Sequence, residues 1–484
     1  MTKEYFKIEN CTKLKDIKPG GKVHFIGVCG VAMGQLAVAL SQAGFKVSGS
    51  DKTFYEPMGS FLKNSQLKLF LEYDSNNIQD YDLVVIGNAI SYPHPEVLKV
   101  EEKKIPYTFF SKLLYEYLIA DTKAITVCGT HGKTTTTSLI AQVLENLNLN
   151  PSYFIGGVVP NLPLSLKKGT GGFSVVEGDE YDSAFFAKTP KFHFYHPTTC
   201  IINAIEFDHS DIYSNINEIK SEFDKLVNSI SNNGKIIVNL DCEEIFDSLD
   251  NWKVNSKAKI ITFGENLSSD YIIKERRYLD CLQLISVEFE QKSFVIKTPL
   301  IGLINARNSL ATYICLKEQG VDSDAILKSL SNSQSVRRRN EIFLEKGNSL
   351  FIEDFAHHPT AVRETLLALK EVYKEKKIIA LFEPASNTSR KKVFENDYQI
   401  SFSLADDLII LKPKLRENED SKDLLDLETF VKNIRIKGNA YLFNSSDEII
   451  DYLKSNFNTK ENALYILMSN SSFDALKFKI LNKL

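Results

Sequence analysis

Short apolar runs alternate with longer stretches of mixed polarity along the whole chain. Near the N-terminus the pattern predicts strands at residues 23–28, 46–49 and 83–86 and a helix at residues 32–43. Strands that alternate with helices form a parallel sheet covered by helices on both faces, so this segment predicts an α/β domain. Residues 23–40 are apolar enough to suggest a membrane helix, but their glycines and polar side chains favour a strand that runs into a buried helix.

The same alternation starts again twice. The second cycle has strands at 123–127, 173–177 and 200–203, antiparallel strands within 271–297 and a helix at 305–319. The third cycle opens near Val336, with strands at 350–354, 378–382, 408–411 and 464–468 and helices at 360–373 and 474–481. We therefore predict an α/β protein of three domains. They are a Rossmann-like N-terminal domain (residues 1–121), a central P-loop ATPase-type domain (122–334) and a C-terminal Rossmann-like domain (335–484).

A glycine loop follows the strand at residues 123–127, and an amphipathic run at residues 138–147 comes after it. Strand, loop and helix together form a phosphate cradle, in which backbone N–H groups face the anion, Lys133 adds a positive charge and Thr134 can hold Mg²⁺. Val127 stands where the common pattern has a glycine, so this loop is a shorter form. A tight turn without a ligand is the alternative, but it gives Lys133 no role. The predicted ATP-binding residues of this loop are Gly129, Thr130, His131, Gly132, Lys133, Thr134 and Thr135.

Another glycine loop lies at the first strand-to-helix turn of the chain. Gly27, Gly30 and Gly34 would let the backbone approach a pyrophosphate, and Asp51 follows the next strand, where an acid can bond a ribose. Cys29 replaces the usual middle glycine, so the dinucleotide pattern is incomplete. The alternative is that these glycines only allow close helix packing. If the loop does bind a nucleotide, the protein has two nucleotide sites, one for an activating triphosphate and one for a nucleotide-tagged substrate.

Polar side chains follow two buried strands of the second cycle. Glu177 opens a segment with four carboxylates in six residues, and such a cluster must be solvated or opposed by cations. Because Mg²⁺ prefers carboxylate and hydroxyl oxygens near phosphates, Glu177 is a candidate metal ligand, although a solvated acidic loop is the alternative. His209 follows the next strand and could bind a second metal ion or a phosphate, although a lone histidine is more often structural.

Two polar segments lie at the start of the third cycle. Three successive arginines, Arg337 to Arg339, form either a solvated turn or a hinge that delivers a guanidinium to a transferring phosphoryl group. Asp354, His357 and His358 follow at a strand-to-helix connection. A zinc pair is not predicted there, because no further cysteine or histidine lies nearby in the sequence.

Composition narrows the class of protein. A net charge of −4 argues against bulk nucleic-acid binding. The seven cysteines form no CxxC pair and are odd in number, which is typical of reduced thiols in the cytoplasm. Cys128, beside the phosphate loop, is therefore interpreted as strand packing and not as a nucleophile. The N-terminal residues start no signal peptide. We expect no nucleic-acid, membrane or obligate protein partner.

In their order along the chain, these motifs resemble the Mur ligase family of bacterial cell-wall enzymes. The motifs are GVCGVAMG, GSD, GTHGKTTTT, EGDEYD, EFDHSD, RRR and DFAHHP, and they cover nearly the whole chain. Within the family, Tyr181, the Asp354-Phe355-Ala356 run and the Glu383-Pro384 pair resemble the member that attaches a recycled tripeptide. The L-alanine-adding relative typically has a serine where Tyr181 stands and a tyrosine-glycine where Phe355-Ala356 stands.

The resemblance implies a mechanism and a role for each motif. ATP would phosphorylate the lactyl carboxylate of UDP-N-acetylmuramate, and the amine of L-alanyl-γ-D-glutamyl-meso-diaminopimelate would attack the acyl phosphate. Lys133 would neutralise the phosphates, Thr134 and Glu177 would hold one Mg²⁺, and His209 would bind a second. The remaining implied contacts are Asn305 and Asn308 to adenine, Arg338 to the γ-phosphate, Asp354 to the ATP ribose, Gly27, Gly30, Gly34, Asp51 and Asn88 to the UDP sugar, and His357 and His358 to the peptide.

The chain departs from the family pattern at several positions. Ile304 replaces a histidine near the adenine contacts, Ala385 replaces an arginine that often follows Glu-Pro, and Ser471-Ser472 replace two glycines. Phe223 stands where several relatives have a carbamylated lysine, so that modification is not predicted. Three alternatives remain open, namely an L-alanine-adding ligase, an NAD(P)-dependent oxidoreductase that uses the first glycine loop, and a catalytically silent nucleotide-binding regulator.

Overall fold

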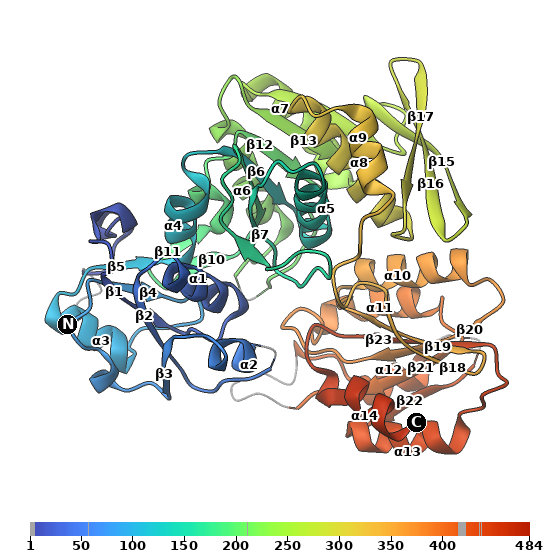
Figure 1. The fold of residues 1–484 in the computed structure, drawn as a ribbon. Helices are drawn as coiled ribbons and strands as arrows, with labels where there is room; N and C mark the ends of the chain where they lie inside the picture. Colours follow the sequence, from blue (N-terminus) through green and yellow to red (C-terminus); the bar gives the residue numbers. More distant parts are fainter. Residues whose placement is uncertain (1–4, 57, 211, 415–422, 435, 437) are drawn as a thin grey trace. The chain divides into compact units, whose positions relative to one another are not determined.

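The computed structural model describes residues 5–56, 58–210, 212–414, 423–434, 436 and 438–484. Their strands form three larger sheets and a two-stranded ribbon of β10 (Asp182–Ala184) and β11 (Ala187–Pro190) (Figure 1). Contacts divide the chain into two compact units. The first consists of Met1–Phe207, Asn215–Ile272 and Leu310–Ser329, and the second of Asp208–Ser214, Ile273–Ser309 and Leu330–Leu484. Each unit has its own buried apolar core.

The first sheet is parallel and contains five strands in the order β3-β2-β1-β4-β5. The strands are β1 (Lys22–Ile26), β2 (Lys46–Asp51), β3 (Lys68–Leu71), β4 (Leu83–Ile86) and β5 (Tyr107–Phe109). The helices of this part are α1 (Val31–Gln42), α2 (Met58–Lys63), α3 (Pro95–Lys103) and α4 (Phe110–Leu114). The predicted strands β1, β2 and β4 and the helix α1 are confirmed. β3 and β5 were not predicted, because β3 has no buried residue and β5 is only three residues long.

The second sheet has ten strands in the order β17-β16-β15-β14-β13-β12-β6-β9-β7-β8. They are β6 (Lys123–Cys128), β7 (Ser152–Phe154), β8 (Leu166–Lys167), β9 (Phe173–Gly178), β12 (Thr199–Ile202), β13 (Lys235–Asn239), β14 (Lys259–Gly264), β15 (Tyr271–Leu279), β16 (Leu282–Phe289) and β17 (Lys292–Thr298). Its helices are α5 (Lys133–Asn146), α6 (Ile216–Ser229), α7 (Glu243–Asn255), α8 (Leu303–Glu318) and α9 (Ser323–Leu330). Because β12, β6 and β9 are parallel neighbours, their carboxyl ends meet at one edge of the sheet.

Helix α5 differs from the amphipathic helix expected at residues 138–147. Every residue from Thr135 to Leu144 is buried, so this part of the helix has no solvated face. Two of its buried polar side chains form hydrogen bonds inside the protein, since Ser138 donates to the Thr135 carbonyl at 2.8 Å and Asn161 donates to Gln142 at 3.0 Å. The amphipathic pattern is wrong for Ser138 to Leu144, because the surrounding protein buries the polar as well as the apolar positions of this part of the helix.

The third sheet contains six strands in the order β18-β19-β23-β20-β21-β22, parallel except for β18. They are β18 (Glu341–Lys346), β19 (Ser349–Asp354), β20 (Lys377–Phe382), β21 (Asp407–Leu411), β22 (Ala440–Phe443) and β23 (Ala463–Met468). The helices are α10 (Pro359–Val372), α11 (Glu395–Phe402), α12 (Leu427–Asn433), α13 (Ser446–Asn456) and α14 (Leu476–Lys483). None of the helices in the described part of the chain has the length and apolar character needed to cross a bilayer.

Candidate functional site

The phosphate loop connects β6 to α5, and its shape depends on two glycines. Gly129 has φ +116° and Gly132 has φ +81°, in the region that side chains with a Cβ rarely adopt. A Cβ on Gly129 would also lie 2.7 Å from the carbonyl oxygen of Ala204. The Thr130 N–H donates to that same oxygen at 2.9 Å, which ties the loop to the segment after β12. The loop is therefore closely packed against the end of the neighbouring strand.

Lys133 begins helix α5 and points back into the loop. Its ammonium group donates to the Gly129 carbonyl at 2.7 Å and to Glu180 Oε2 at 2.8 Å. Burial alone would lower the pKa of Lys133, but the carboxylates of Glu180 and Asp179 outweigh that effect and hold the pKa above its ordinary value. The side chain is therefore a buried, permanently charged cation, as a phosphate-binding lysine needs to be. Its pairing with Glu180 was not predicted.

Thr134 and Glu177 lie together beside this cation. The Thr134 hydroxyl donates to Glu177 Oε2 at 2.8 Å, and the Gly156 N–H donates to the other carboxylate oxygen. Glu177 is only 5% exposed, and burial, followed by the negative charge of Asp179, raises the pKa of its carboxyl group. A hydroxyl and a carboxylate oxygen at this spacing form the donor set that Mg²⁺ prefers, so these two side chains fit a metal ion. An arriving cation would also relieve the cost of burying the Glu177 charge.

The acidic segment at the end of β9 is paired with cations and largely shielded from solvent, which argues against a solvated acidic loop. Lys191 donates to Asp179 at 2.9 Å and to the Tyr181 hydroxyl at 2.8 Å, and it is itself only 5% exposed. Burial alone would raise the pKa of Asp179, but the ammonium groups of Lys191 and Lys133 hold it below its ordinary value. Lys191 was missed by the sequence analysis, because no motif marks it and only the fold brings it to this strand end.

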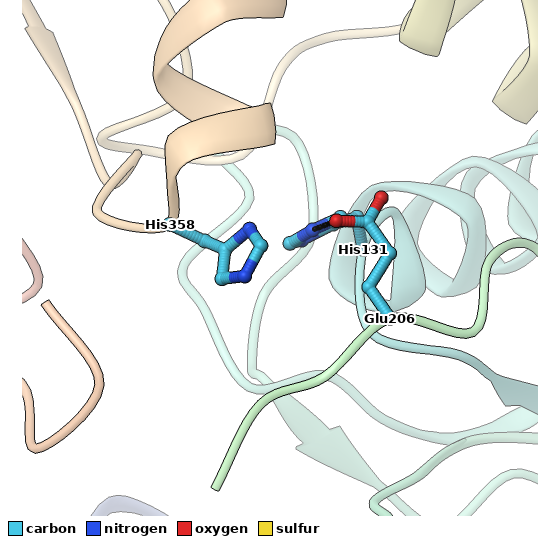
Figure 2. A group of neighbouring side chains, drawn as sticks. All are labelled: His131, Glu206 and His358. Atoms are coloured by element: carbon cyan, nitrogen blue, oxygen red, sulfur yellow. Dashed lines mark ion pairs between the residues drawn. The ribbon is translucent and has the colours of Figure 1, made fainter. Parts of the chain in front are cut away.

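The histidine of the phosphate loop faces an acid from the segment after β12. His131 Nε2 lies 3.4 Å from Glu206 Oε2, as Figure 2 shows, and Thr130 Oγ1 accepts a hydrogen bond from the Glu206 N–H at 2.9 Å. The third side chain drawn in Figure 2, His358, belongs to the second compact unit. Contacts from both the backbone and the side chain of Glu206 thus fix the conformation of the loop at Thr130 and His131.

Cys128, the last residue of β6, is a packing residue and not a nucleophile. It is fully buried, and its sulfur lies 3.9 Å from that of Cys200 on the neighbouring strand β12. Burial, together with Cys200, raises its pKa well above the ordinary value, so the thiol stays protonated.

The first glycine loop is held by a carboxylate from the next strand of the sheet, β2. Asp51, at the end of β2, accepts the Cys29 N–H at 2.7 Å and the Tyr73 hydroxyl at 3.2 Å. Gly27 has φ +84°, and a Cβ on Gly34 would meet the Met58 side chain at 2.6 Å. Both interpretations of these glycines therefore have support, because Gly27 serves the turn and Gly34 serves helix packing.

Asn88 completes the residues predicted to bind the UDP sugar. It is exposed in the segment after β4. Since β4 lies beside β1 in the parallel sheet, Asn88 follows the carboxyl end of a neighbouring strand.

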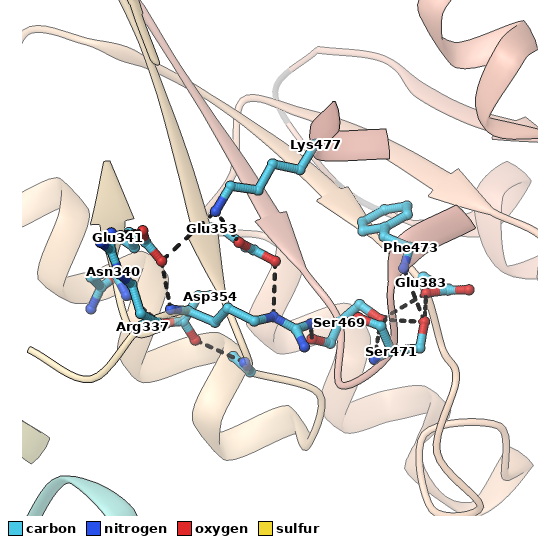
Figure 3. Close-up of polar contacts among 12 residues, drawn as sticks. Arg337, Asn340, Glu341, Glu353, Asp354, Glu383, Ser469, Ser471, Phe473 and Lys477 are labelled. Carbon is cyan, nitrogen blue, oxygen red and sulfur yellow. Dashed lines mark hydrogen bonds and ion pairs between the residues drawn. The ribbon is translucent and has the colours of Figure 1, made fainter. Parts of the chain in front are cut away.

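Two of the candidate residues in the second compact unit are held in a polar network (Figure 3). Arg338 donates to the Ser469 carbonyl at 2.8 Å and lies 2.8 Å from Glu353. Asp354 is 4% exposed and accepts the N–H groups of Asn340 at 2.7 Å and Ala356 at 2.8 Å. Burial raises the pKa of Asp354, against the opposing effect of Arg339. These contacts order the start of the third sheet.

The remaining candidates of this unit lie at loops and at the start of α8. His209 has φ +54°, and its carbonyl accepts the N–H groups of Ile212 and Tyr213. The Asn308 side chain donates to Asn305 at 3.2 Å. Burial lowers the pKa of His357 to about 4, so its imidazole is neutral at pH 7.

Of the residues predicted to be catalytic or to hold the metal ion, the first unit thus brings together Lys133, Thr134 and Glu177. His209 and Arg338 belong to the second unit, and their predicted roles remain predictions.

Comparison with known proteins identifies the family. Three family models match this chain, the Mur ligase family catalytic domain over residues 22–121, the Mur ligase middle domain over residues 127–316 and the Mur ligase glutamate ligase domain over residues 338–470. The chain belongs to the Mur ligase family. As a Mur ligase it is an ATP-dependent enzyme that forms amide bonds. This membership removes the support for an NAD(P)-dependent oxidoreductase.

Individual relatives cover most of this Mur ligase. It is 34% identical over 402 residues to the UDP-N-acetylmuramate–L-alanyl-γ-D-glutamyl-meso-2,6-diaminoheptandioate ligase of Escherichia coli. The matched region covers 81% of this chain and 85% of that protein. It is 31% identical over 433 residues to the UDP-N-acetylmuramate–L-alanine ligase of Pelagibacter ubique, covering 88% of this chain and 90% of that protein. The crystal structure of a murein peptide ligase from Psychrobacter arcticus matches with a TM-score of 0.71 and 28% identity, over 96% of this chain and 98% of that one.

These matches confirm the predicted α/β fold with three domains. The domain boundaries after residues 121 and 334 stay predictions.

Proposed function

We propose that this Mur ligase joins the recycled tripeptide L-alanyl-γ-D-glutamyl-meso-diaminopimelate to UDP-N-acetylmuramate, in peptidoglycan recycling. The observation that carries the proposal is the buried group at the ends of β6 and β9, where Lys133 donates into the phosphate loop and Thr134 contacts Glu177. The names of the Escherichia coli relative and of the Psychrobacter arcticus structure support the choice of the tripeptide.

The proposed reaction begins with activation of the sugar's carboxylate. A carboxylate is a poor electrophile, so its oxygen attacks the γ-phosphate of ATP, ADP leaves, and an acyl phosphate forms. Lys133 neutralises charge on the β- and γ-phosphates, and Arg338 approaches the γ-phosphate. Asn305 and Asn308 hold the adenine, and Asp354 holds the ribose. Magnesium, when bound by Thr134 and Glu177 with a second ion at His209, supplies further charge neutralisation.

The second step forms the amide bond. The α-amine of the tripeptide attacks the acyl carbon, the C–O bond to phosphate breaks, and the amine loses a proton as phosphate leaves. The N-terminal domain holds the UDP sugar through Gly27, Gly30, Gly34, Asp51 and Asn88. The C-terminal domain holds the peptide near His357 and His358. Burial keeps His357 uncharged at pH 7, so its imidazole adds no positive charge beside the bound peptide. ATP and a nucleotide sugar as substrates place the proposed reaction in the cytoplasm.

An L-alanine-adding ligase is the second candidate, favoured by the similarity to the Pelagibacter ubique enzyme. Phosphate release with ATP and UDP-N-acetylmuramate distinguishes the two. We expect strong stimulation by the tripeptide and weak stimulation by L-alanine. The opposite order would overturn the proposal, and no stimulation by any amine would favour a catalytically silent regulator.

A further inference from the structure

A group of buried polar side chains lies between two strands of the first sheet and helix α3. His24 on β1, Ser50 on β2 and Glu96 on α3 are all 0% exposed. Glu96 accepts the Ser50 hydroxyl at 2.6 Å and, at its other oxygen, the Asn77 amide at 2.8 Å. Burying an acid together with a histidine is costly, and neither of them belongs to the residues predicted to contact the UDP sugar.

This group adjoins the first glycine loop through the end of β2. The Ser50 carbonyl accepts the Gly27 N–H at 2.9 Å and the Val28 N–H at 3.0 Å. The next residue, Asp51, accepts the Cys29 N–H at 2.7 Å. The position of Ser50 therefore sets both the turn of the loop and the carboxylate that holds it.

The Ser48 hydroxyl offers only a lone pair to His24. The Tyr81 hydroxyl donates to the Asn77 carbonyl at 3.1 Å, and Ser48 donates to the Tyr81 oxygen at 3.1 Å. The Ser48 proton is thus directed away from His24, whose Nδ1 lies 2.9 Å from the Ser48 oxygen. Because an oxygen that offers a lone pair needs a donor, Nδ1 carries a proton.

The other ring nitrogen of His24 is in the same situation. Ser50 donates its proton to Glu96, and His24 Nε2 lies 3.3 Å from the Ser50 oxygen. Burial alone would raise the pKa of Glu96, but its contacts with His24, Ser50 and Asn77 hold that pKa below its ordinary value. An imidazole that donates from both nitrogens is a cation, and the Glu96 carboxylate, 4.0 Å from Nε2, is its counterion. The His24 ring also stacks on Tyr81 with centroids 4.8 Å apart, a position that suits a cation.

We propose that His24 is a buried imidazolium that positions Ser50, and with it the first glycine loop, for the UDP sugar. The Ser50 hydroxyl is held between the His24 cation and the Glu96 anion, so the end of β2 has one orientation. His24 and Glu96 act through the loop and are positioning residues. Their effect on substrate binding rests on the proposed function, whereas the charge of His24 does not.

NMR of the full-length protein labelled with ¹⁵N-histidine tests the charge of His24. The chain has eight histidines, and the double variant His24→Gln/Glu96→Gln, which leaves neither charge, identifies the signal of His24 by its loss. We expect both ring nitrogens of His24 to carry a proton in the wild type at pH 7. Glu96→Gln removes the counterion, so one of these protons should be lost. Glu102→Gln, which changes an acid of α3 that is 66% exposed, should leave the signal unchanged.

Calorimetry on the same proteins tests the positioning. We expect Glu96→Gln to raise the Kd for UDP-N-acetylmuramate about 2- to 10-fold, the range of one hydrogen bond, through a looser glycine loop. The Kd for ATP should not change, because the phosphate loop belongs to the second sheet. Glu102→Gln should bind both ligands as the wild type does. If Glu96→Gln does not fold, the double variant takes its place and should show the same weaker binding of the sugar alone.

The outcomes separate this inference from the proposed function. A wild type in which His24 has one ring proton overturns the inference, because the shared proton then lies on Glu96. Unchanged binding of the UDP sugar in Glu96→Gln, or equal weakening for ATP and the sugar, overturns the positioning role. A wild type that does not bind UDP-N-acetylmuramate contradicts the proposed function and the positioning role with it, while the NMR signal still decides the charge of His24.

Discussion

The two glycine loops of this Mur ligase share an architecture but hold different groups. Each follows a parallel strand, β1 or β6, and each leads into a helix, α1 or α5. In the first loop, the Cys29 N–H donates to Asp51, a carboxylate from the next strand. In the second loop, Lys133 donates to the Gly129 carbonyl, and Glu180 is its acidic partner. The first loop is thus held by the Asp51 carboxylate, and the second by the Lys133 ammonium group with Glu180 as its counterion.

The difference shows that a strand–loop–helix unit alone does not determine how a nucleotide is used. In the first loop, the Asp51 carboxylate already accepts the Cys29 N–H, a donor that a phosphate would otherwise use. This loop therefore suits hydrogen-bond donors such as ribose hydroxyls. A loop closed by the buried ammonium of Lys133 can exchange Glu180 for a phosphate and gain charge neutralisation. We therefore expect changes in the second loop to affect turnover and changes in the first to affect substrate affinity.

Removing the cation of the second loop should have the largest effect. Lys133→Met is expected to lower kcat/KM for ATP by about 10²- to 10³-fold, the effect of losing one charge that stabilises a transition state. It also removes the Lys133 ammonium group from its ion pair with Glu180, which is only 2% exposed. Breaking a buried pair costs about 3–5 kcal/mol, so the free energy of unfolding measured in urea should fall by that amount.

A double variant separates the two effects of this change. In Lys133→Met/Glu180→Gln no charge is left unpaired, so most of the unfolding free energy should return while turnover stays low. Lys167→Met, which breaks the more exposed pair with Glu145, serves as the control and should cost no more than about 1 kcal/mol. A double variant with wild-type turnover would refute the catalytic role of Lys133.

Changing the predicted metal ligand tests whether the second loop acts through Mg²⁺. Glu177→Gln keeps an oxygen that can accept the Thr134 hydroxyl but removes the charge. We expect a loss in kcat of about 10²-fold at a fixed Mg²⁺ concentration. A titration of activity against Mg²⁺ should also show a higher half-saturating concentration. An unchanged Mg²⁺ dependence would mean that Glu177 is not a ligand.

Asp51→Ala tests the first loop. It removes the acceptor of the Cys29 N–H, and we expect KM for the UDP sugar to rise about 10-fold, equivalent to one hydrogen bond, while KM for ATP is unchanged. Asp82→Ala is a matched control, because Asp82 accepts the Lys22 N–H at 2.7 Å at the opposite end of β1. Equal changes in the KM values for ATP and the UDP sugar would contradict the division of roles between the loops.

The parts of this fold that could be predicted are those where burial leaves a strong pattern. Strands β4, β6, β9 and β12 are buried at nearly every position, so they appear as apolar runs in the sequence. Strands β3 and β22 contain no buried residue, and their sequences resemble loops. Lys133, Thr134 and Glu177 were found because Glu177 lies at the end of β9, and the other two follow the glycine loop after β6.

The polar partners of the site could not be predicted in the same way. Glu180 and Lys191 take part through a chain reversal at β10 and β11, and the sequence shows no motif at Lys191. Asp51 was predicted from its spacing, but its contact with Cys29 depends on how β2 lies beside β1. Pairings of this kind are set by the register of strands and turns, which a single sequence does not state.

The smallest expected effect concerns the stability of the second loop and its dependence on pH. The pKa of Glu177 is raised in the folded protein, by burial first and by Asp179 second, so the folded state favours its protonated form. For an acid with a raised pKa, that stabilisation is full below the unfolded value, about 4.3, and is lost as pH rises through the folded value. When the pH exceeds the folded pKa of Glu177 and no metal ion is present, the ionised carboxylate therefore opposes folding.

Glu177→Gln should thus stabilise the metal-free protein while it lowers activity. We expect a gain of about 1–2 kcal/mol at pH 8, and this gain should shrink towards zero as the pH approaches the unfolded pKa of glutamate. Urea unfolding of both proteins in chelator, from pH 8 down to pH 5, measures the trend. Added Mg²⁺ should then reverse the order at pH 8, because it binds the ionised wild-type site and stabilises that folded state alone. A variant less stable than the wild type at every pH would show that the Thr134 and Gly156 contacts outweigh the cost of the buried charge.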